Sequence, residues 1–285
     1  MSSKLKLVEC PRDAMQGMKE FVPTALKIEY INKLLNCGFD TIDFGSFVSP
    51  KAIPQMRDTA EVLKGLNLNE SSKLLAIIAN SRGAEDALSF EEIDYLGYPF
   101  SVSETFQMRN TNATLEESLT RVEEIQNLAT KKGKKMVVYL SMGFGNPYGD
   151  EWSPEIVLNW SQRLNNLFGI EILALSDTVG AAKKEEIEPL FSLLMKELPK
   201  VEFGAHLHTT SEKARDVIEA AYNAGCRRFD SAMKGFGGCP MAKDDLTGNL
   251  PTEILLEWLK KKNIVSGIEE KAFQDAYSFS SRIFS

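Results

Sequence analysis

Short runs of strand-forming residues recur along this chain with helical patterns between them, and the alternation constrains the fold more than any other feature. The eight runs begin near Leu5, Thr41, Leu74, Phe100, Met136, Ile172, Val201 and Arg228. Strands that alternate with helices form parallel sheets, because each connection needs a helix to return the chain to the same edge. Eight such units predict a closed α/β fold, the (β/α)8 TIM barrel, built as a single domain over residues 1–285.

The segments between the runs carry signals of helix ends. Thr114 and Glu117 have the spacing of a capping box ahead of an apolar stripe. Ser153 followed by Pro154 is typical of a helix start, and Gly225 is typical of a helix end. An open, doubly wound sheet is the alternative, but its GxGxxG fingerprint is missing from the first strand–helix turn. In a barrel, the chemistry is expected at the carboxyl ends of the strands.

Composition excludes several classes of protein. The chain is 43% apolar and 26% charged, which is ordinary for a globular protein. Its net charge is −7, and the densest basic run, at 131–135, lies between a helix and a strand pattern, so we expect no nucleic-acid partner. No apolar run approaches the ~20 residues that span a bilayer, and we expect no membrane association.

The start of the chain and its cysteines bear on location. A strand-like stretch follows Lys4 directly, which leaves no room for a signal peptide. The 4 cysteines are widely spaced and form no CxxC pair, which favours reduced thiols in a cytoplasmic protein. Both observations predict a cytoplasmic location.

The 2 histidines of the chain are near neighbours, His206 and His208. Positions two apart on a strand share a face, so both imidazoles are expected to point into the barrel. Phe203, Ala205 and Leu207 would then face the surrounding helices. Two imidazoles at one strand end can share a metal ion, or they can be unrelated polar residues that fill the barrel mouth. The pair alone leaves both interpretations open.

Polar residues also follow other strand runs. They are Arg12 and Asp13 after the first, Asp43 after the second, Asn80 after the third, Glu104 after the fourth, and Asp177 with Thr178 after the sixth. An adjacent arginine and aspartate are by themselves more often a surface ion pair than a catalytic pair. Five such strand ends, together with the two histidines, favour a common cavity that holds a hard cation.

The segment after the eighth run contains three glycines followed by Cys239 and Pro240. It can be a plain turn with a structural thiol, or a mobile loop whose thiol transfers a proton. Asn249 follows shortly after, either as part of a helix start or as a metal ligand through its amide oxygen. The other thiols, Cys10, Cys37 and Cys226, look structural.

Several of these motifs occur in the same order in one enzyme family. They are Pro11-Arg12-Asp13, Ser46-Phe47-Val48-Ser49-Pro50-Lys51, Pro54-Gln55-Met56, Asp177-Thr178, the His206/His208 pair, Gly237-Gly238-Cys239-Pro240 and Gly248-Asn249-Leu250. From about Val8 to Leu259 the chain resembles the 3-hydroxy-3-methylglutaryl-CoA lyases, which share a metal-dependent TIM barrel with isopropylmalate and homocitrate synthases. The segments 46–51 and 237–240 favour the lyase branch.

The resemblance implies a divalent cation, Mg²⁺ or Mn²⁺, and an acyl-CoA substrate. The implied metal ligands are Asp13, His206, His208 and Asn249. The implied catalytic residues are Arg12, which stabilises the enolate oxygen, Cys239, which assists proton transfer, and Asp43, which occupies the place of an acid–base glutamate. Gln16 and Asp177 would position the substrate together with Arg12, and Lys19 matches a basic residue near the CoA side.

The implied reaction is the cleavage of 3-hydroxy-3-methylglutaryl-CoA to acetyl-CoA and acetoacetate. Ala14, Asp43 and Lys234 depart from the family pattern, which leaves another 3-hydroxyacyl-CoA open as substrate. Two further alternatives are an acyltransferase that condenses acetyl-CoA with a 2-oxo acid and a non-catalytic metal-binding barrel. We also expect a homodimer or a higher homo-oligomer.

Overall fold

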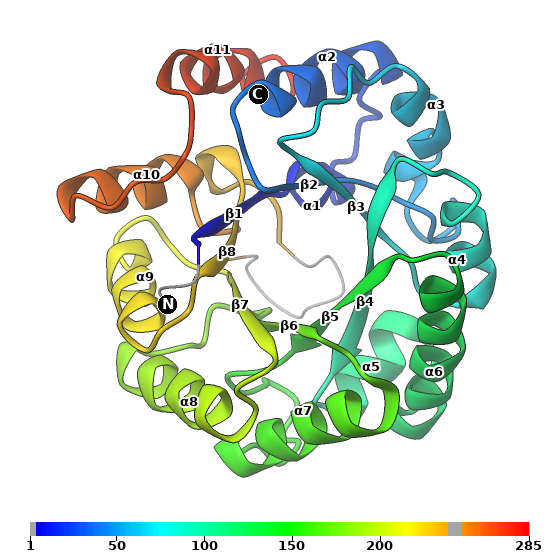
Figure 1. Cartoon of the computed structure of the whole chain (residues 1–285), viewed down its shortest axis with the longest axis vertical. Helices are drawn as coiled ribbons and strands as arrows, with labels where there is room; N and C mark the ends of the chain where they lie inside the picture. The colour runs from blue at the N-terminus through cyan, green and yellow to red at the C-terminus, as the bar shows by residue number, and fades with distance from the viewer. Residues whose placement is uncertain (1–3, 239–246, 285) are drawn as a thin grey trace.

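Eight parallel strands close into a barrel in the computed structural model, which describes residues 4–238 and 247–284 (Figure 1). The strands are β1 (Lys6–Glu9), β2 (Thr41–Ser46), β3 (Lys73–Ile77), β4 (Ile93–Ser101), β5 (Lys135–Ser141), β6 (Ile172–Asp177), β7 (Glu202–Leu207) and β8 (Arg228–Ser231). Each strand pairs with the next in the sequence, and β8 pairs with β1 from Lys6↔Arg228 to Glu9↔Ser231. The predicted (β/α)8 architecture is therefore confirmed.

The fourth strand is the one whose start was predicted wrongly. Strand β4 begins at Ile93, well before Phe100, whereas the other strands begin within one residue of their predicted starts. Gly97 and Pro99 lie inside β4, and both are typical strand breakers. Pro99 is tolerated because it lies beyond Ile77↔Gly97, the last register pair between β3 and β4.

The helices lie mostly in an outer ring around the barrel (Figure 1). They are α1 (Pro11–Gln16), α2 (Thr24–Leu35), α3 (Thr59–Lys64), α4 (Ser81–Ala87), α5 (Glu104–Thr111), α6 (Leu115–Lys131), α7 (Pro154–Phe168), α8 (Lys184–Glu197), α9 (Ala214–Asn223), α10 (Thr252–Lys261) and α11 (Glu270–Ser280), with short 3-10 turns at Pro54–Met56 and Met233–Gly235. Helix α1 lies beside β2 inside that ring, and helix α11 packs on α2 (Figure 1). The capping box at Thr114 and the N-cap at Ser153 are both present.

Apolar residues pack in two layers. One small cluster lies inside the barrel and includes Ile77, Val137 and Tyr139. The larger cluster lies between the strands and the helices, and it contains Phe203, Ala205 and Leu207 from alternate positions of β7. The residues between them face inward, so the predicted alternation along β7 is confirmed.

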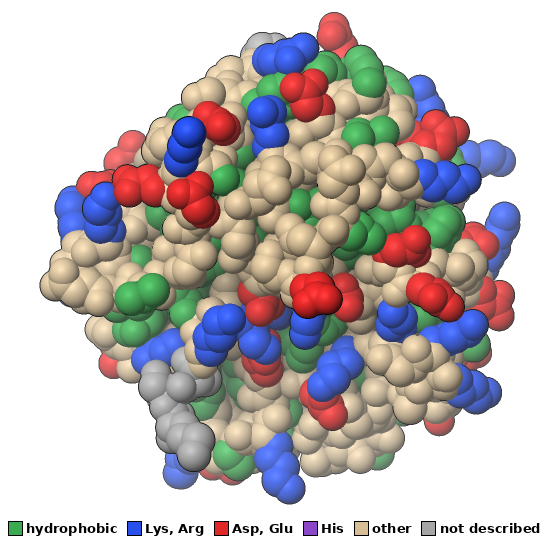
Figure 2. All heavy atoms as spheres, turned by 45° about the horizontal axis from the view of Figure 1, so that its top comes forward, with side chains coloured by type: hydrophobic (Ala, Val, Ile, Leu, Met, Phe, Trp, Pro, Cys, Tyr) green, Lys and Arg blue, Asp and Glu red, His purple; other side chains and the backbone are tan. Residues whose placement is uncertain are grey.

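The surface is mixed in charge. Figure 2 shows basic and acidic side chains interspersed on the face that it draws, with no broad area of one sign. Within residues 4–238 and 247–284, every helix is too short or too polar to cross a membrane.

A buried glutamate links the first strand to the segment after the last one. Glu9 has no solvent exposure, and its carboxyl group accepts hydrogen bonds from Met233 N at 2.8 Å and Thr252 Oγ1 at 2.6 Å. Burial raises the pKa of Glu9 to about 8, although both hydrogen bonds act against this. Met233 and Thr252 flank the connection from β8 to α10, so Glu9 anchors both ends of the segment that carries Asn249.

This anchor makes the stability of the fold depend on pH. The pKa of Glu9 is about 8 in the folded chain against an ordinary 4.5, so folding takes up a proton in this interval. The free energy of unfolding should therefore fall as the pH rises between about 5 and 8. Glutamine has the shape and hydrogen-bonding pattern of the uncharged acid, so Glu9→Gln should make this decline shallower in urea titrations. An unchanged slope in the variant would contradict the assignment.

Candidate active site

A cavity of about 130 Å³ opens at the carboxyl ends of the strands. Its lining comes from several strand ends and from α1 and α5: Arg12, Asp13, Gln16, Val48, Ile53, Ile77, Ala79, Pro99, Phe106, Asn110, Thr111, Tyr139, Ser141, Ser176, Thr178, His206 and His208. Cys10 follows the end of β1, and Pro11 then opens α1, which places Arg12 and Asp13 in the first helical turn at the mouth of the barrel. The cavity lies where chemistry is expected in such a barrel.

Asp13, His206 and His208 form a compact group of metal-ligand type. One ligand atom of each lies within 4.8 Å of the others, and Asp13 Oδ2 is 4.0 Å from His206 Nε2 and 3.9 Å from His208 Nε2. All three side chains are buried. Neither ring nitrogen of His208 has a hydrogen-bond partner within the described residues. Burying unpaired nitrogens is costly, and a cation between the three groups would satisfy them, so the group fits a divalent metal ion.

The two imidazoles differ in their electrostatics. Burial together with the charge of His206 lowers the pKa of His208 to about 4, which keeps its imidazole neutral at physiological pH. Burial also acts to lower the pKa of His206, but the hydrogen bond and the charge of Asp230 raise it above its ordinary value. Neutral imidazole is the form that binds a metal, and His208 is already in that form.

Asn249 adjoins this group through its amide nitrogen. Its Nδ2 donates hydrogen bonds to Asp13 Oδ2 at 2.7 Å and to Phe236 O at 2.9 Å. Both partners are acceptors, which supports this orientation of the amide. The structure therefore brings Asn249 to the predicted metal ligands as a partner of Asp13, and the ligand role of its amide oxygen stays a prediction.

Arg12 is held rigidly between two carboxylates. Its Nε and Nη2 donate to Asp43, with Nη2 2.5 Å from Oδ2, and its Nη1 donates to Asp13 Oδ1 at 2.8 Å and to Gln16 Oε1 at 2.9 Å. Burial acts to lower the pKa of Arg12, but Asp43 and Asp13 raise it above its ordinary value. The guanidinium group is thus a fixed positive charge on the cavity wall.

Asp43 lies behind Arg12 and is fully buried. Burial raises the pKa of Asp43 to about 6, although the charge of Arg12 acts to lower it. Asp43 is absent from the described lining of the cavity, and both of its oxygens contact Arg12. The structure therefore places Asp43 where it orients the guanidinium group.

Other predicted residues lie away from the cavity lining. Asp177 is buried and accepts hydrogen bonds from Ala181 N and Ala182 N at 2.9 and 2.8 Å, so it shapes the turn after β6. Lys19 is exposed and is not among the described lining residues. Cys239 lies outside the described residues.

The expectation that Asn80 and Glu104 share the cavity is wrong. The side chain of Asn80 accepts a hydrogen bond from Gly83 N and caps α4. Glu104 is the first residue of α5, where an acidic side chain is favoured by the helix dipole. Both polar residues follow their strands because a helix begins there, and neither lines the cavity.

Sequence reasoning missed two residues beside the predicted ligands. Tyr139 lines the cavity, and its ring packs edge-on against His206 with centroids 5.3 Å apart. Asp230 Oδ2 lies 3.2 Å from His206 Nδ1. Applying the period of two along β5 and β8, as was done for β7, would have placed both side chains inside the barrel.

The geometry predicts a specific loss of metal binding in His208→Ala. The variant should bind Mn²⁺ more weakly than wild type by more than the roughly tenfold to hundredfold that loss of an outer partner costs, because a direct ligand is removed. The metal-free variant should unfold at a temperature close to that of metal-free wild type, since the ring nitrogens of His208 have no hydrogen-bond partner among the described residues.

Calorimetric titration and thermal unfolding with and without Mn²⁺ measure both effects. Thr209→Ala, at the neighbouring buried position, is the matched control and should bind Mn²⁺ like wild type. Equal Mn²⁺ affinity of His208→Ala and Thr209→Ala would remove His208 from the metal site.

Comparison with known proteins gives a consistent result. The chain is 34% identical over 278 residues to the cytoplasmic 3-hydroxy-3-methylglutaryl-CoA lyase of Rattus norvegicus, covering 96% of this chain and 80% of that one. It is 33% identical over 277 residues to the 3-hydroxy-3-isohexenylglutaryl-CoA/hydroxy-methylglutaryl-CoA lyase of Pseudomonas aeruginosa, covering 97% and 91%.

Solved structures and family profiles extend this comparison. An HMG-CoA lyase from Acinetobacter baumannii, solved in complex with coenzyme A and 3-methylmalate, superposes with a TM-score of 0.91 at 30% identity, covering 100% of this chain and 92% of that one. The profile of the HMGL-like family matches residues 4–279. The chain therefore belongs to the HMGL-like family.

Proposed function

We propose that this protein is a hydroxymethylglutaryl-CoA lyase that cleaves 3-hydroxy-3-methylglutaryl-CoA to acetyl-CoA and acetoacetate. The observation that carries the proposal is the buried group of Asp13, His206 and His208 beside the fixed guanidinium of Arg12 in one cavity. The names of relatives that are 33–34% identical over most of the chain support it.

We assign the cation site to Asp13, His206 and His208, with Asn249 as a further candidate ligand. A set of oxygen and imidazole donors with room for substrate suits Mg²⁺ or Mn²⁺ better than a closed structural zinc site. Held by these residues, such a cation would lower the pKa of the substrate hydroxyl.

Arg12 acts where negative charge develops. Loss of the proton from the C3 hydroxyl turns that oxygen into a carbonyl and breaks the C2–C3 bond, and the electron pair passes to the departing acyl-CoA fragment. The fragment is a thioester enolate, whose oxygen is stabilised by the guanidinium of Arg12. Asp43 and Asp13 hold this group in place beforehand, so it need not reorganise during the reaction.

Proton transfer needs a group that returns a proton to C2 of the enolate. We assign this to Cys239, on the basis of the family resemblance: its thiolate first accepts the proton of the C3 hydroxyl, and the thiol so formed returns that proton to C2. Asp43 acts through Arg12 in this scheme, because both of its oxygens contact the guanidinium and it lies behind the cavity wall.

We further propose that Gln16, Asp177 and Lys19 serve the substrate in different ways. Gln16 lines the cavity and donates to Asp13 Oδ1 at 2.6 Å, so it can orient both the ligand carboxylate and the substrate. Asp177 would position the substrate indirectly, through the turn after β6 that its hydrogen bonds to Ala181 and Ala182 hold in place. Lys19 is an exposed cation on the same connection after β1 and would attract the phosphates of CoA.

A second substrate has one observation in its favour. The cavity has an apolar wall formed by Val48, Ile53, Ile77 and Phe106. Such a wall accommodates an alkyl group on C3, and the Pseudomonas aeruginosa relative is named for a substrate with a longer C3 group. A 3-hydroxyacyl-CoA with a larger C3 substituent is therefore the alternative substrate.

Location and assembly are also proposals. Cys10, Cys37 and Cys226 are free thiols, which supports a reducing compartment such as the cytoplasm. A homodimer or higher homo-oligomer remains an expectation from the family.

The direct test of the activity is incubation of the Mn²⁺-loaded protein with 3-hydroxy-3-methylglutaryl-CoA while acetoacetate and acetyl-CoA are measured. Equal amounts of both products support the lyase. A longer 3-alkyl analogue, assayed in parallel, separates the two substrates by kcat/KM. Absence of acetyl-CoA, the product common to both compounds, from both reactions would leave a non-catalytic barrel as the better explanation.

Arg12→Gln should lower kcat by about 10²–10³ and change KM little, because the enolate charge exists only as the bond breaks. Arg12→Lys keeps the charge but loses the two-point contact with Asp43, so its kcat should lie between those of Arg12→Gln and wild type. Steady-state kinetics measure kcat and KM separately, and thermal unfolding is the control for folding. A near-normal kcat with a large KM would make Arg12 a simple binding residue.

Cys239→Ser should fold like wild type and lose most activity, because a serine hydroxyl is a much weaker acid than a thiol. Alkylation of the wild type should inactivate it, and substrate should slow that reaction. Full activity of the serine variant, or labelling confined to the other three cysteines in mass spectrometry, would exclude a catalytic role for this thiol.

A further inference from the structure

We propose that Asp230 is a positioning residue that holds His206 in the one tautomer able to bind the cation. The inference rests on the proposed metal site, since it concerns how one of its ligands is prepared. Asp230 belongs to β8, and His206 belongs to the adjacent strand β7, paired with it in register. The proposal assigns a task to a buried carboxylate that the cleavage chemistry does not use.

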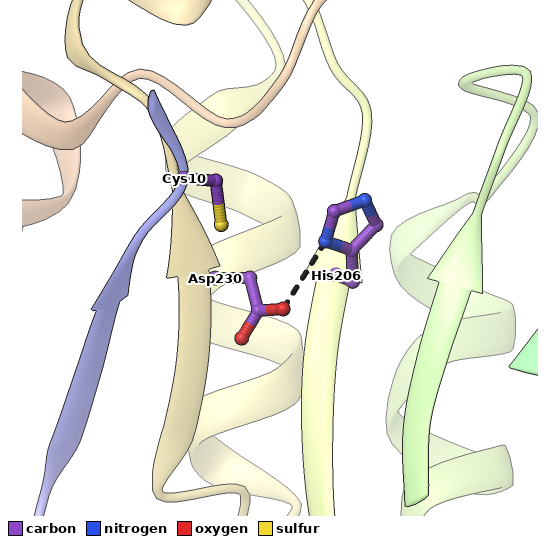
Figure 3. A group of neighbouring side chains, drawn as sticks. All are labelled: Cys10, His206 and Asp230. Atoms are coloured by element: carbon purple, nitrogen blue, oxygen red, sulfur yellow. Dashed lines mark hydrogen bonds and ion pairs between the residues drawn. The ribbon is translucent and has the colours of Figure 1, made fainter. Parts of the chain in front are cut away.

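Figure 3 shows the contact that carries the proposal. Oδ2 of Asp230 lies 3.2 Å from Nδ1 of His206, and Asp230 is 2% exposed. The other ring nitrogen, Nε2, is 4.0 Å from Oδ2 of Asp13. The imidazole therefore stands between two carboxylates, with one nitrogen toward each.

The chemistry of the two contacts fixes the tautomer. A neutral imidazole has one N–H and one lone pair, and a carboxylate can only accept a hydrogen bond. The hydrogen therefore belongs on Nδ1, facing Asp230, and the lone pair of Nε2 is directed toward Asp13. A carboxylate behind a metal-binding histidine orients the ring and makes it a better donor.

The surroundings of His206 oppose rotation of the ring. Tyr139 packs edge-on against it, and the ring of His208 lies at a centroid distance of 5.3 Å.

Asp230 also has a positive charge nearby. Arg228 lies two residues before Asp230 on β8, and its side chain is also buried. Burial acts to lower the pKa of Arg228, and the charge of Asp230 is the largest influence that raises it. Arg228 therefore supplies a countercharge to the carboxylate inside the barrel.

Cys10 offers a competing interpretation of the same group. Its thiol, a ring nitrogen of His206 and a carboxylate oxygen of Asp230 lie within 4.8 Å of one another, so the three side chains could hold a second metal ion (Figure 3). Such an ion would take Nδ1 away from Asp230. With both nitrogens bound to cations, His206 would also have to lose its ring proton. The geometry favours Asp230 as an orienting group over this second ion.

The first experiment determines the His206 tautomer in the wild-type protein. The chain has 2 histidines, so the imidazole ¹⁵N spectrum of the metal-free protein holds two sets of signals, and His208→Ala identifies the set of His206. At about pH 9, above the ordinary imidazole pKa, we expect His206 with its hydrogen on Nδ1. A hydrogen on Nε2 in the wild type would overturn the proposal.

The second experiment uses Asp230→Asn. The asparagine amide has no charge and so holds the hydrogen on Nδ1 less strongly than the carboxylate does, and its NH2 group can instead donate to Nδ1, which moves the ring hydrogen to Nε2 and blocks the metal. We expect the ¹⁵N spectrum to show that shift, and the Kd for Mn²⁺ to rise by about 10- to 100-fold in calorimetric titration. An Asp230→Asn variant that binds Mn²⁺ like wild type would overturn the proposal.

Two comparisons separate the possible failures. Cys10→Ala removes the thiol of the second-ion interpretation and should leave both the His206 tautomer and the Mn²⁺ affinity unchanged. A Cys10→Ala variant that loses affinity as Asp230→Asn does would support the second ion and overturn the orienting role. Failure of the wild type itself to bind Mn²⁺ would refute the metal site and the inference with it, whereas normal binding in Asp230→Asn refutes the inference alone.

Discussion

The hydrogen bonding of β8 to β1 is the constraint on which the rest of the molecule depends. It closes the barrel from Lys6↔Arg228 to Glu9↔Ser231 and so joins segments from opposite ends of the sequence. Asp13, just beyond β1, meets His206 and His208 of the β7 end only because of this closure. The buried carboxyl group of Glu9 reinforces the closure by accepting hydrogen bonds from Met233 and Thr252, which lie after β8.

The charges inside the barrel mouth depend on one another. Arg12 is buried with Asp13 and Asp43, and burial of any one of these charges without its partners would be costly. Asp13 also faces both histidines and accepts a hydrogen bond from Asn249. The same carboxylate therefore couples the proposed cation site to the guanidinium proposed to stabilise the enolate, and effects of substitutions at these positions are not expected to add independently.

Residue patterns predicted the fold well because strand and helix alternation is a local property that the barrel repeats. They failed at β4, where Gly97 and Pro99 resemble a break although the strand continues. At the site, the period of two on β7 correctly turned both histidines inward. Two contacts were not predicted: that of Asp230 with His206, and the hydrogen bond that the amide nitrogen of Asn249 donates to Asp13. Each joins side chains from different segments, and residue spacing along one segment does not determine how such side chains meet. For the same reason, Asn80 and Glu104 were taken for cavity residues although they serve helix starts.

Closure by the last strand has a consequence for synthesis on the ribosome. Asp13 emerges from the tunnel long before the histidines with which it shares a site, and most of the barrel must be translated in between. An incomplete chain that ends before β7 holds one carboxylate of the group and neither imidazole. The full set of proposed cation ligands is thus assembled only in a finished barrel, so an abortive chain cannot present it.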